Sequence, residues 1–315
     1  KKEKKAVETE LRIHETNPQL GLYNLLNHML FLPEGLQHQD NIQAQIDLLP
    51  KLTPQILKDW ALDYYGSGNT VISITGNFNE RQILNKIKKK LKKEEDPRIR
   101  PYYKNIFKPG IDVQHLHKNI DNTTIFFVFW SPLLYNDKNY FLIELFKEFV
   151  GTGTTSILFD RLREQKNLIY NIGIDYYTMP YGTYFLLEIS TKTPNVPIVV
   201  EETIKILKKL SANKFTLDDL KACKRSHKIG FFQDGEPSNE FISTHFAEQY
   251  INQLFNVNEN TKVVTPEKMF KQIQDVKKHE FAAFINKILV FSNLKIAYQG
   301  KKKFPSLLSK ITKLI

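Results

Sequence analysis

Two stretches of the sequence share one pattern, and this repeat constrains the fold more than any other feature. Leu52–Gly76 aligns without gaps onto Val276–Gly300, so the two copies lie 224 residues apart. Each stretch reads as an apolar helix, a turn and a short apolar strand, and three residue pairs are identical: Asn69/Asn293, Ile72/Ile296 and Gly76/Gly300. Self-similarity at a fixed spacing predicts two copies of one structural unit.

The repeat predicts that the chain holds the end of one domain and the whole of a second. We expect residues 1–85 to be the C-terminal remnant of the first domain, residues 86–110 to be a charged linker, and residues 111–315 to be the complete second domain. By the same spacing, the first copy would begin about 110 residues before Lys1. A hydrophobic content of 41% is ample for packed cores.

Local patterns predict the order of helices and strands. Thr53-Pro54 is typical of an N-cap followed by proline at the first helical position, and Thr216 with Asp219 predicts a capping box. Helices are expected over the first fifteen residues, after Thr53, and over Asp137–Val150, Ser156–Gln165 and most of Val196–Phe291. Strands are expected over Val71–Ile74, Thr123–Trp130, Ile169–Tyr177, Thr183–Thr191 and Leu294–Tyr298.

The net charge of +11 is concentrated in three lysine-rich runs. Lys1–Lys5, Lys86–Lys93 and Lys301–Lys313 carry +3, +6 and +5, which leaves the other residues at −3. The sequence contains no zinc-finger, RNP or basic-zipper pattern. Nucleic-acid binding is therefore a remote alternative, and we expect no nucleic-acid partner.

Apolar runs such as Ile125–Trp130 are far shorter than the roughly 20 residues that cross a bilayer. The single Cys223 cannot form an internal disulfide. We therefore expect no membrane partner and a cytoplasmic location. The sequence begins with Lys1 rather than Met, so it does not test for a targeting segment.

Two carboxylates share one face of the first predicted helix. Glu3 and Glu10 are seven residues apart, which is close to two helical turns. His14 follows on the same face, but no other metal-ligand spacing is present, and we expect this histidine to be exposed. Surface helices are rich in glutamate, so this spacing alone assigns no role to the pair.

A second candidate site lies between a predicted helix and a predicted strand. Arg163 near the end of the helix and Tyr170 at the start of the strand are placed to hydrogen-bond a ligand that extends along the strand edge. On spacing alone, ordinary positive charge opposite the dipole at a helix C-terminus is the better explanation of the arginine. Two further segments do not match the motifs that they resemble. Gly151–Ser156 lacks the spacing of a phosphate-binding loop, and His245–Gln249 lacks the second histidine of a zinc motif.

Together these features resemble the pitrilysin/insulinase family of zinc metallopeptidases, which includes mitochondrial processing peptidase. Glu3–Leu11, continuing to Asn17-Pro18, looks like the family's E-x-x-x-V-x-x-E-[LI] helix, and Leu52–Gly76 resembles its helix, turn and strand signature. The motifs that follow one another in the second domain of the family resemble four segments of this chain, namely Gly151–Gly153, Leu162–Glu164, Tyr170 and Tyr181-Gly182. The matches follow the family order and cover nearly the whole chain.

The resemblance implies an α+β fold of tandem domains, each a mostly antiparallel sheet with helices packed on one face. It also implies that Glu10 is the distal zinc ligand and that Glu3 supports the metal site. Arg163 and Tyr170 would grip the substrate backbone and polarise the scissile carbonyl. The H-x-x-E-H motif, which supplies two histidine ligands and the glutamate base, is absent from the 315 residues.

The function that the resemblance implies is that of a zinc metalloendopeptidase that cleaves extended peptides inside a closed chamber. We expect this chain to be a fragment without the zinc-binding motif, and therefore inactive by itself. The alternative is a non-catalytic peptide-binding or partner subunit of the same family. The expected cofactor of the complete enzyme is Zn²⁺, and the expected partners are a peptide substrate and a second copy or related subunit.

Overall fold

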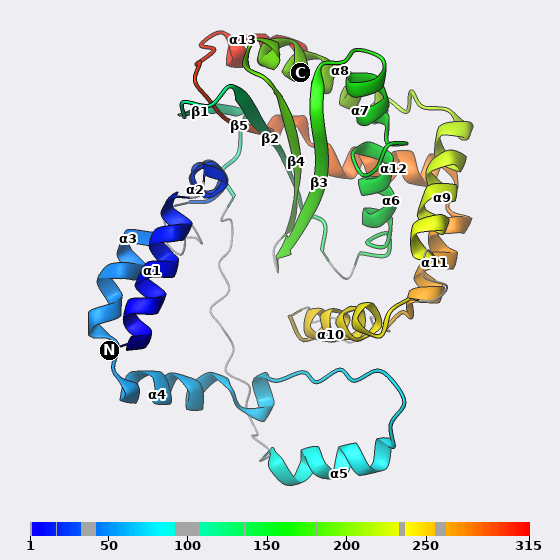
Figure 1. The fold of residues 1–315 in the computed structure, drawn as a ribbon. Helices are drawn as coiled ribbons and strands as arrows, with labels where there is room; N and C mark the ends of the chain where they lie inside the picture. Colours follow the sequence, from blue (N-terminus) through cyan, green and yellow to red (C-terminus); the bar gives the residue numbers. More distant parts are fainter. Residues whose placement is uncertain are drawn as a thin grey trace.

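A five-stranded sheet forms the centre of residues 107–315 in this computed structural model (Figure 1). The structure describes residues 2–16, 18–32, 42–91, 107–134, 137–179, 182–232, 237–255 and 263–315. The strands are β1 (Asp112–His117), β2 (Asn122–Ser131), β3 (Ile169–Met179), β4 (Gly182–Lys192) and β5 (Lys295–Gly300). They lie in the order β1-β5-β2-β4-β3, with β1 parallel to β5 and all other neighbours antiparallel. The α+β class is confirmed.

The central strand β2 is apolar along most of its length because both of its faces are buried. Ile125, Phe127 and Phe129 belong to one core cluster, and Phe126 and Val128 belong to another. Successive side chains of a strand point to opposite faces, so a strand covered on both sides needs a continuous apolar run.

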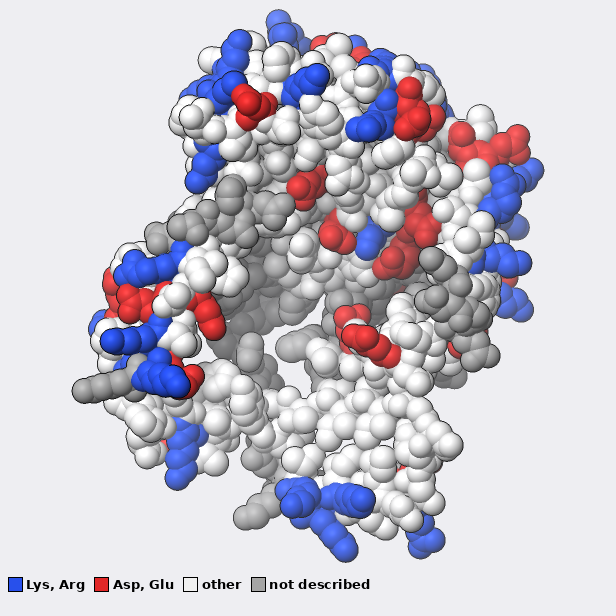
Figure 2. All heavy atoms as spheres, viewed as in Figure 1, with Lys and Arg blue, Asp and Glu red and all other residues white. Residues whose placement is uncertain are grey.

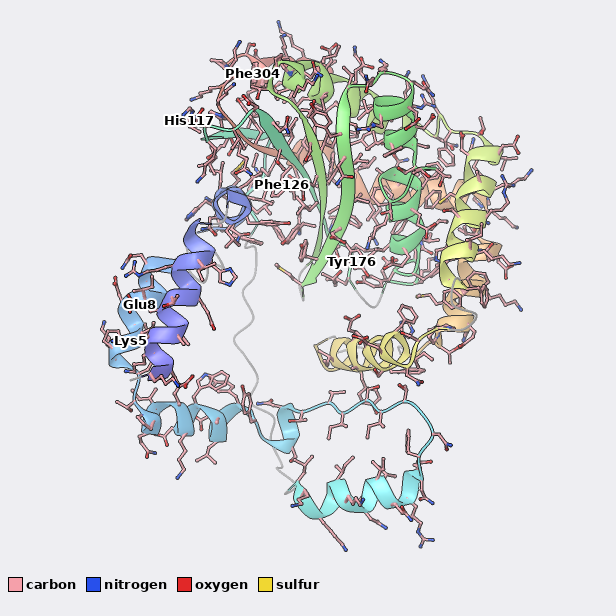
Figure 3. The ribbon with its side chains drawn as sticks, in the orientation of Figure 1. Lys5, Glu8, His117, Phe126, Tyr176 and Phe304 are labelled. Atoms are coloured by element: carbon pink, nitrogen blue, oxygen red, sulfur yellow. The ribbon has the colours of Figure 1, made fainter. Side chains whose placement is uncertain are left out.

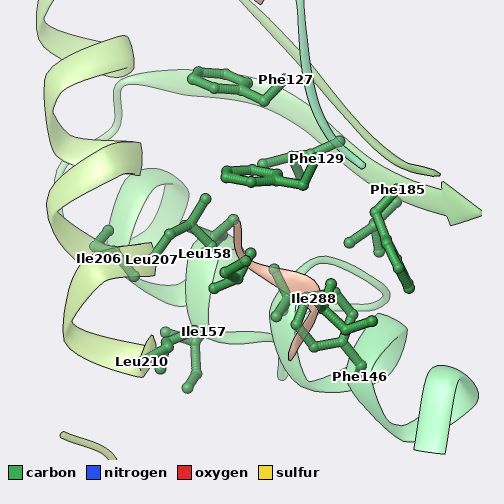
Figure 4. Close-up of a cluster of buried hydrophobic side chains, with 14 of the residues drawn as sticks. Phe127, Phe129, Phe146, Ile157, Leu158, Phe185, Ile206, Leu207, Leu210 and Ile288 are labelled. Carbon is green, nitrogen blue, oxygen red and sulfur yellow. The ribbon is translucent and has the colours of Figure 1, made fainter. Parts of the chain in front are cut away.

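One face of the sheet is covered by the helices of the same part of the chain. Phe146 on α6 lies 5.2 Å from Phe185 of β4 and 6.4 Å from Phe284 of α12, measured between ring centroids. Figure 4 shows Phe127 and Phe129 of β2 above this layer. The helices of residues 107–315 are α6 (Leu142–Val150), α7 (Ile157–Phe159), α8 (Val196–Ser211), α9 (Leu217–Phe231), α10 (Asn239–Phe255), α11 (Pro266–Asp275), α12 (Lys278–Ile288) and α13 (Leu307–Leu314). All of them except α10 contribute described residues to the core cluster on this face.

The opposite face of the sheet receives a helix from the N-terminal segment. Helix α2 (Pro18–Leu30) buries Leu22, Leu26 and Met29 in the cluster that contains Phe126, which Figure 3 labels. The ring of Tyr23 lies 4.9 Å from that of Phe126. The expectation of helices on one face therefore holds for the helices of residues 107–315, while α2 covers part of the other face.

The N-terminal segment contains no strand within its described residues. Its other helices are α1 (Lys2–Thr16), α3 (Ile42–Leu48), α4 (Pro54–Tyr64) and α5 (Glu80–Lys90). The predicted N-cap is confirmed, because Thr53 Oγ1 accepts a hydrogen bond of 3.1 Å from the backbone N–H of Ile56. The predicted strand at Val71–Ile74 is wrong, because a strand needs a neighbour and no described strand lies beside it.

Several helix boundaries differ from the expectation. The helix predicted over Asp137–Val150 begins at Leu142, and Ser156–Gln165 divides into α7 and a π-helix, η4 (Asp160–Glu164). The capping box of Thr216 and Asp219 is confirmed. The first part of the predicted linker belongs to α5, whereas residues 92–106 and Tyr181 lie outside the described residues. None of the described helices combines the length and apolarity that a bilayer span requires.

The helices and turns near the N-terminus recur 224 residues later in the chain. Helix α4 corresponds to α12 at both ends, and the 3₁₀ turn η3 (Ser67–Asn69) corresponds in the same way to η6 (Phe291–Asn293). At this spacing, the start of α3 matches the start of α11 and the end of α5 matches the end of α13. The two segments therefore share local structure, while the division into domains stays a prediction.

The two copies differ in what covers them. Phe281 of α12 is fully buried, whereas its counterpart Leu57 of α4 is 55% exposed. Phe284 of α12 is also buried, whereas its counterpart Trp60 of α4 is 46% exposed. Figure 2 shows uncharged side chains gathered over the stretch between η3 and α5. An apolar helix face of this kind is typical of a surface that another element covers.

Replacing Phe281 by alanine should lower the free energy of unfolding by about 3–5 kcal/mol, because it opens a cavity in the packed core. Leu57→Ala, at the equivalent position of the repeat, should change it by less than about 0.5 kcal/mol. Urea unfolding followed by circular dichroism measures both values. Equal losses for the two variants would show that α4 is buried in solution.

Candidate functional site

The predicted pair Arg163 and Tyr170 lies at the start of β3, the last strand of the sheet. No described strand pairs with the outer edge of β3, so the sheet ends there. The side chain of Tyr170 is 44% exposed. Figure 1 shows the start of β3 beside α7, at the end of the sheet that lies away from α10. This edge is a place where an extended chain could add as a further strand.

Tyr170 occupies a β-bulge. Ile169 pairs with Thr191 and Asn171 pairs with Ser190, so the register shifts between the two and Tyr170 has no partner residue on β4. A bulge bends the strand and changes the direction of the extra residue's side chain. The phenol of Tyr170 is therefore directed by an irregularity in the strand.

Arg163 is bound to the backbone of that bulge. Its Nη1 donates hydrogen bonds to the carbonyl oxygens of Ile169, at 3.0 Å, and of Tyr170, at 2.8 Å. A charged donor makes stronger hydrogen bonds to carbonyls than a neutral one. The guanidinium thus engages the strand itself, which differs from the ordinary role of a charge opposite a helix C-terminus.

The connection between Arg163 and β3 is tightly bonded. Asn167 has a positive φ of 50°. The N–H of Leu168 donates to the carbonyl of Leu162 at 2.8 Å, and its own carbonyl accepts from Thr191 Oγ1 at 2.6 Å. These bonds hold the turn against the neighbouring strand, so the position of Tyr170 is fixed from both sides.

Glu3 and Glu10 lie on α1, as predicted, and both side chains are exposed. His14 is exposed as well, which confirms the expectation for that residue. Helix α1 packs against α2 and α3, and Figure 3 places its labelled Lys5 and Glu8 far from the start of β3. The structure therefore does not bring the two carboxylates together with Arg163 and Tyr170.

The residues present do not fit a zinc site by themselves. No group of three or more His, Cys, Asp or Glu side chains in the described ranges is arranged to hold a metal ion. A zinc site needs at least three protein ligands, and Glu10 supplies one. The metal-ligand role of Glu10 and the supporting role of Glu3 stay predictions.

A buried polar cluster between α6 and α9 was missed by the sequence reasoning. Glu148 Oε2 and His227 Nδ1 are buried without a hydrogen-bond partner among the described residues. Burial, and to a smaller extent the charge of Glu144, raise the pKa of Glu148 to about 7, although Lys147 opposes the shift. The available signal was a glutamate directly before Phe149 and Val150, on a helix whose other face is apolar.

The same interface contains the single cysteine. Cys223 Sγ lies 3.6 Å from the carbonyl oxygen of Leu145, and burial raises the pKa of its thiol well above the ordinary value. Burial also lowers the pKa of His227. A nucleophilic cysteine needs a lowered pKa and an exposed sulfur, so this cluster is not a cysteine-based catalytic site.

The fold and the edge of β3 define the class: an α+β domain with an exposed edge strand and no metal cluster in its described part. The peptidase M16 inactive domain family matches residues 51–226, which is more than half of the chain. The chain therefore belongs to the peptidase M16 family, of the inactive-domain type. This confirms the resemblance to the pitrilysin/insulinase peptidases.

Solved structures share the fold. A peptidase M16 inactive domain from Pseudomonas fluorescens is 17% identical and superposes with a TM-score of 0.79, covering 96% of this chain and 71% of that one. A chain of complex III from Candida albicans is 14% identical, with a TM-score of 0.77 and coverages of 99% and 74%. A protease from Helicobacter pylori is 18% identical, with a TM-score of 0.66 and coverages of 81% and 60%. No curated protein matches the chain.

The chain should retain less than about 0.1 zinc ion per molecule after dialysis against zinc-free buffer, because a single carboxylate does not hold the ion. Glu10→Gln should leave this value unchanged. Metal analysis by mass spectrometry is the measurement. Stoichiometric zinc that Glu10→Gln removes would contradict the expectation and reveal further ligands.

The raised pKa of Glu148 should make the fold less stable as pH rises. Its folded pKa of about 7 lies above the ordinary 4.5, so the folded state binds the extra proton between these values. The stabilisation that the protonated Glu148 contributes is complete below pH 4.5 and is lost as the pH rises to about 7. Glu148→Gln should remove this decline and raise the free energy of unfolding at pH 8 by roughly 1–3 kcal/mol.

Urea unfolding of both proteins at several pH values measures the difference, and the comparison removes the contribution of His227. Identical pH dependence in the two proteins would show that the Glu148 carboxyl is solvated.

Proposed function

We propose that the chain is a non-catalytic, peptide-binding part of an M16-type assembly, and that it holds an extended peptide along the outer edge of β3. The observation that carries this proposal is the exposed Tyr170 in a bulge at the start of a free edge strand. Membership of the inactive-domain type supports a binding role rather than a catalytic one.

The binding mode follows from the geometry of an edge strand. A peptide that adds to β3 would pair its backbone with the outward-facing N–H and C=O groups of the strand. The Tyr170 phenol, which is exposed at the start of the strand, would donate a hydrogen bond to a peptide carbonyl. Further along β3 the side chain of Asp175 is 68% exposed, and it already forms an ion pair of 3.3 Å with Lys147.

A zinc metallopeptidase is the second candidate, and the exposed Glu3 and Glu10 on one helix favour it. In that case Glu10 would be a zinc ligand supported by Glu3, and Zn²⁺ would activate the attacking water. The described residues lack the rest of such a site, so no step is assigned to it. A related subunit could supply the missing part, and the similarity to a chain of complex III supports the proposal that this protein has partner subunits.

Tyr170→Phe should weaken peptide binding about 3–10-fold, because it removes one hydrogen bond worth about 1 kcal/mol. A suitable probe is a fluorescein-labelled peptide of about 12 residues, matched to the length of β3, that alternates valine, which favours strands, with lysine, which keeps the peptide soluble. Fluorescence anisotropy gives the Kd. The control is Tyr250→Phe, which removes the same group from an exposed tyrosine on α10.

Equal Kd values for the unmodified chain and both variants would place the peptide away from the start of β3. Absence of binding by the unmodified chain would remove the proposed function.

A further inference from the structure

The sheet has a second free edge at β1, on the side opposite to β3 (Figure 1). No described strand pairs with the outer side of β1, and its register with β5 continues without a shift from Asp112 to His117. The strand contains neither a proline nor a bulge. Proteins use such features to prevent an edge from pairing with another chain. Strand β1 therefore keeps a regular backbone edge, whereas β3 is interrupted by the bulge at Tyr170.

Alternate residues of β1 direct their backbone groups away from the sheet. The N–H groups of Asp112 and Lys118 donate to carbonyl oxygens of β5 and of the residue before it, at 3.1 and 3.2 Å. Successive residues of a strand direct these groups to opposite sides, so the even-numbered residues bond to β5. The N–H and C=O groups of Val113, His115 and His117 then face outwards. None of them has a hydrogen-bond partner among the described residues.

A cluster of lysines lies at the end of this edge. Because β1 and β5 are parallel, both strands end at the same side of the sheet. Lys118 follows β1, and Lys301–Lys303 follow β5. Asp121 forms an ion pair with Lys301, so four positive charges and one negative charge leave a net charge of +3. Figure 2 shows Lys and Arg side chains at the corner of the molecule where Figure 3 labels His117.

Two of these lysines have no counter-charge in the described part of the chain. Lys302 and Lys303 are exposed, and neither forms an ion pair with a described carboxylate. The Nζ of Lys302 lies 5.5 Å from the ring centroid of Phe304, which leaves its charge accessible to a ligand. Charge complementarity selects between partners of similar shape. The end of β1 therefore favours a chain that carries carboxylates and disfavours a basic one.

We propose that the outer edge of β1 is a second docking site, which binds an extended acidic segment of another polypeptide as an additional strand. The backbone of that segment pairs with Val113, His115 and His117, and its carboxylates lie beside the lysines that follow β1 and β5. This site is separate from the edge of β3, so the proposal does not rest on the proposed function.

A pair of peptides tests the binding mode. The first is a fluorescein-labelled peptide of about eight residues that alternates valine and glutamate, which is long enough to span β1. The second has the same sequence with N-methyl groups on two adjacent central residues, so that both of its edges lose a donor. Fluorescence anisotropy should show binding of the first and at least about 10-fold weaker binding of the second. Equal Kd values would show attraction by charge alone, and absence of binding by the first peptide would also overturn the proposal.

Two charge-reversal variants test the lysine cluster. Lys302→Glu/Lys303→Glu should weaken binding of the valine-glutamate peptide roughly 5–30-fold at low salt, because it reverses two exposed charges beside the docked strand. Lys88→Glu/Lys89→Glu makes the same change at exposed positions of α5 and should leave the Kd unchanged. Circular dichroism checks that both variants fold. Equal losses in the two variants would show a general charge effect and overturn the proposal.

Hydrogen exchange followed by NMR locates the bound peptide. The amides of Val113, His115 and His117 should exchange at least about 10-fold more slowly with the valine-glutamate peptide bound. The amides between them, which already bond to β5, should change little. Protection confined to β3, or a loss of affinity in Tyr170→Phe, would place the acidic peptide at the other edge and overturn the proposal. Failure of the valine-lysine peptide to bind would remove the proposed function and leave this result unaffected.

Discussion

Burial of β2 on both faces is the constraint on which the rest of the structure depends. One face is covered by α6, α8 and α12, which follow β2 in the chain, whereas the other is covered by α2, which precedes it by about ninety residues. Because large apolar surfaces contribute most of the stabilising free energy, α2 fastens the N-terminal segment to the sheet. The sheet ends at β3, the strand farthest in the order from β1, and the candidate site lies at this edge.

Elements with strong local signals could be predicted, and elements that depend on distant neighbours could not. The apolar run of β2, the β3–β4 hairpin and the Thr53 N-cap each carry their signal within a few residues. Strand β1, in which polar residues and histidines predominate, was not predicted, because it is recognisable only through its pairing with β5. Val71–Ile74 has the composition of a strand and lacks the neighbours that would make it one.

The candidate site shows the same division. The spacing of Arg163 and Tyr170 predicted that the two residues would lie near each other at a strand edge, and the structure places them there. The sequence could not show that the guanidinium is already bonded to the strand. That fact depends on the π-helix and the bulge, and neither has a residue pattern of its own. The α6–α9 cluster was missed because the burial of Glu148 depends on the packing of α9.

An exposed edge strand favours uncontrolled pairing with other chains, so proteins restrict such edges. In β3 the restriction lies at its start, where Arg163 occupies the carbonyls of Ile169 and Tyr170. A strand that approaches this end finds both acceptors already bonded and meets the Tyr170 side chain instead. Asp175 and the exposed ring of Tyr177 lie further along the strand. In the proposed binding mode, a peptide would therefore pair with the part of β3 that lies beyond the bulge, because the arginine already bonds the two carbonyls at its start.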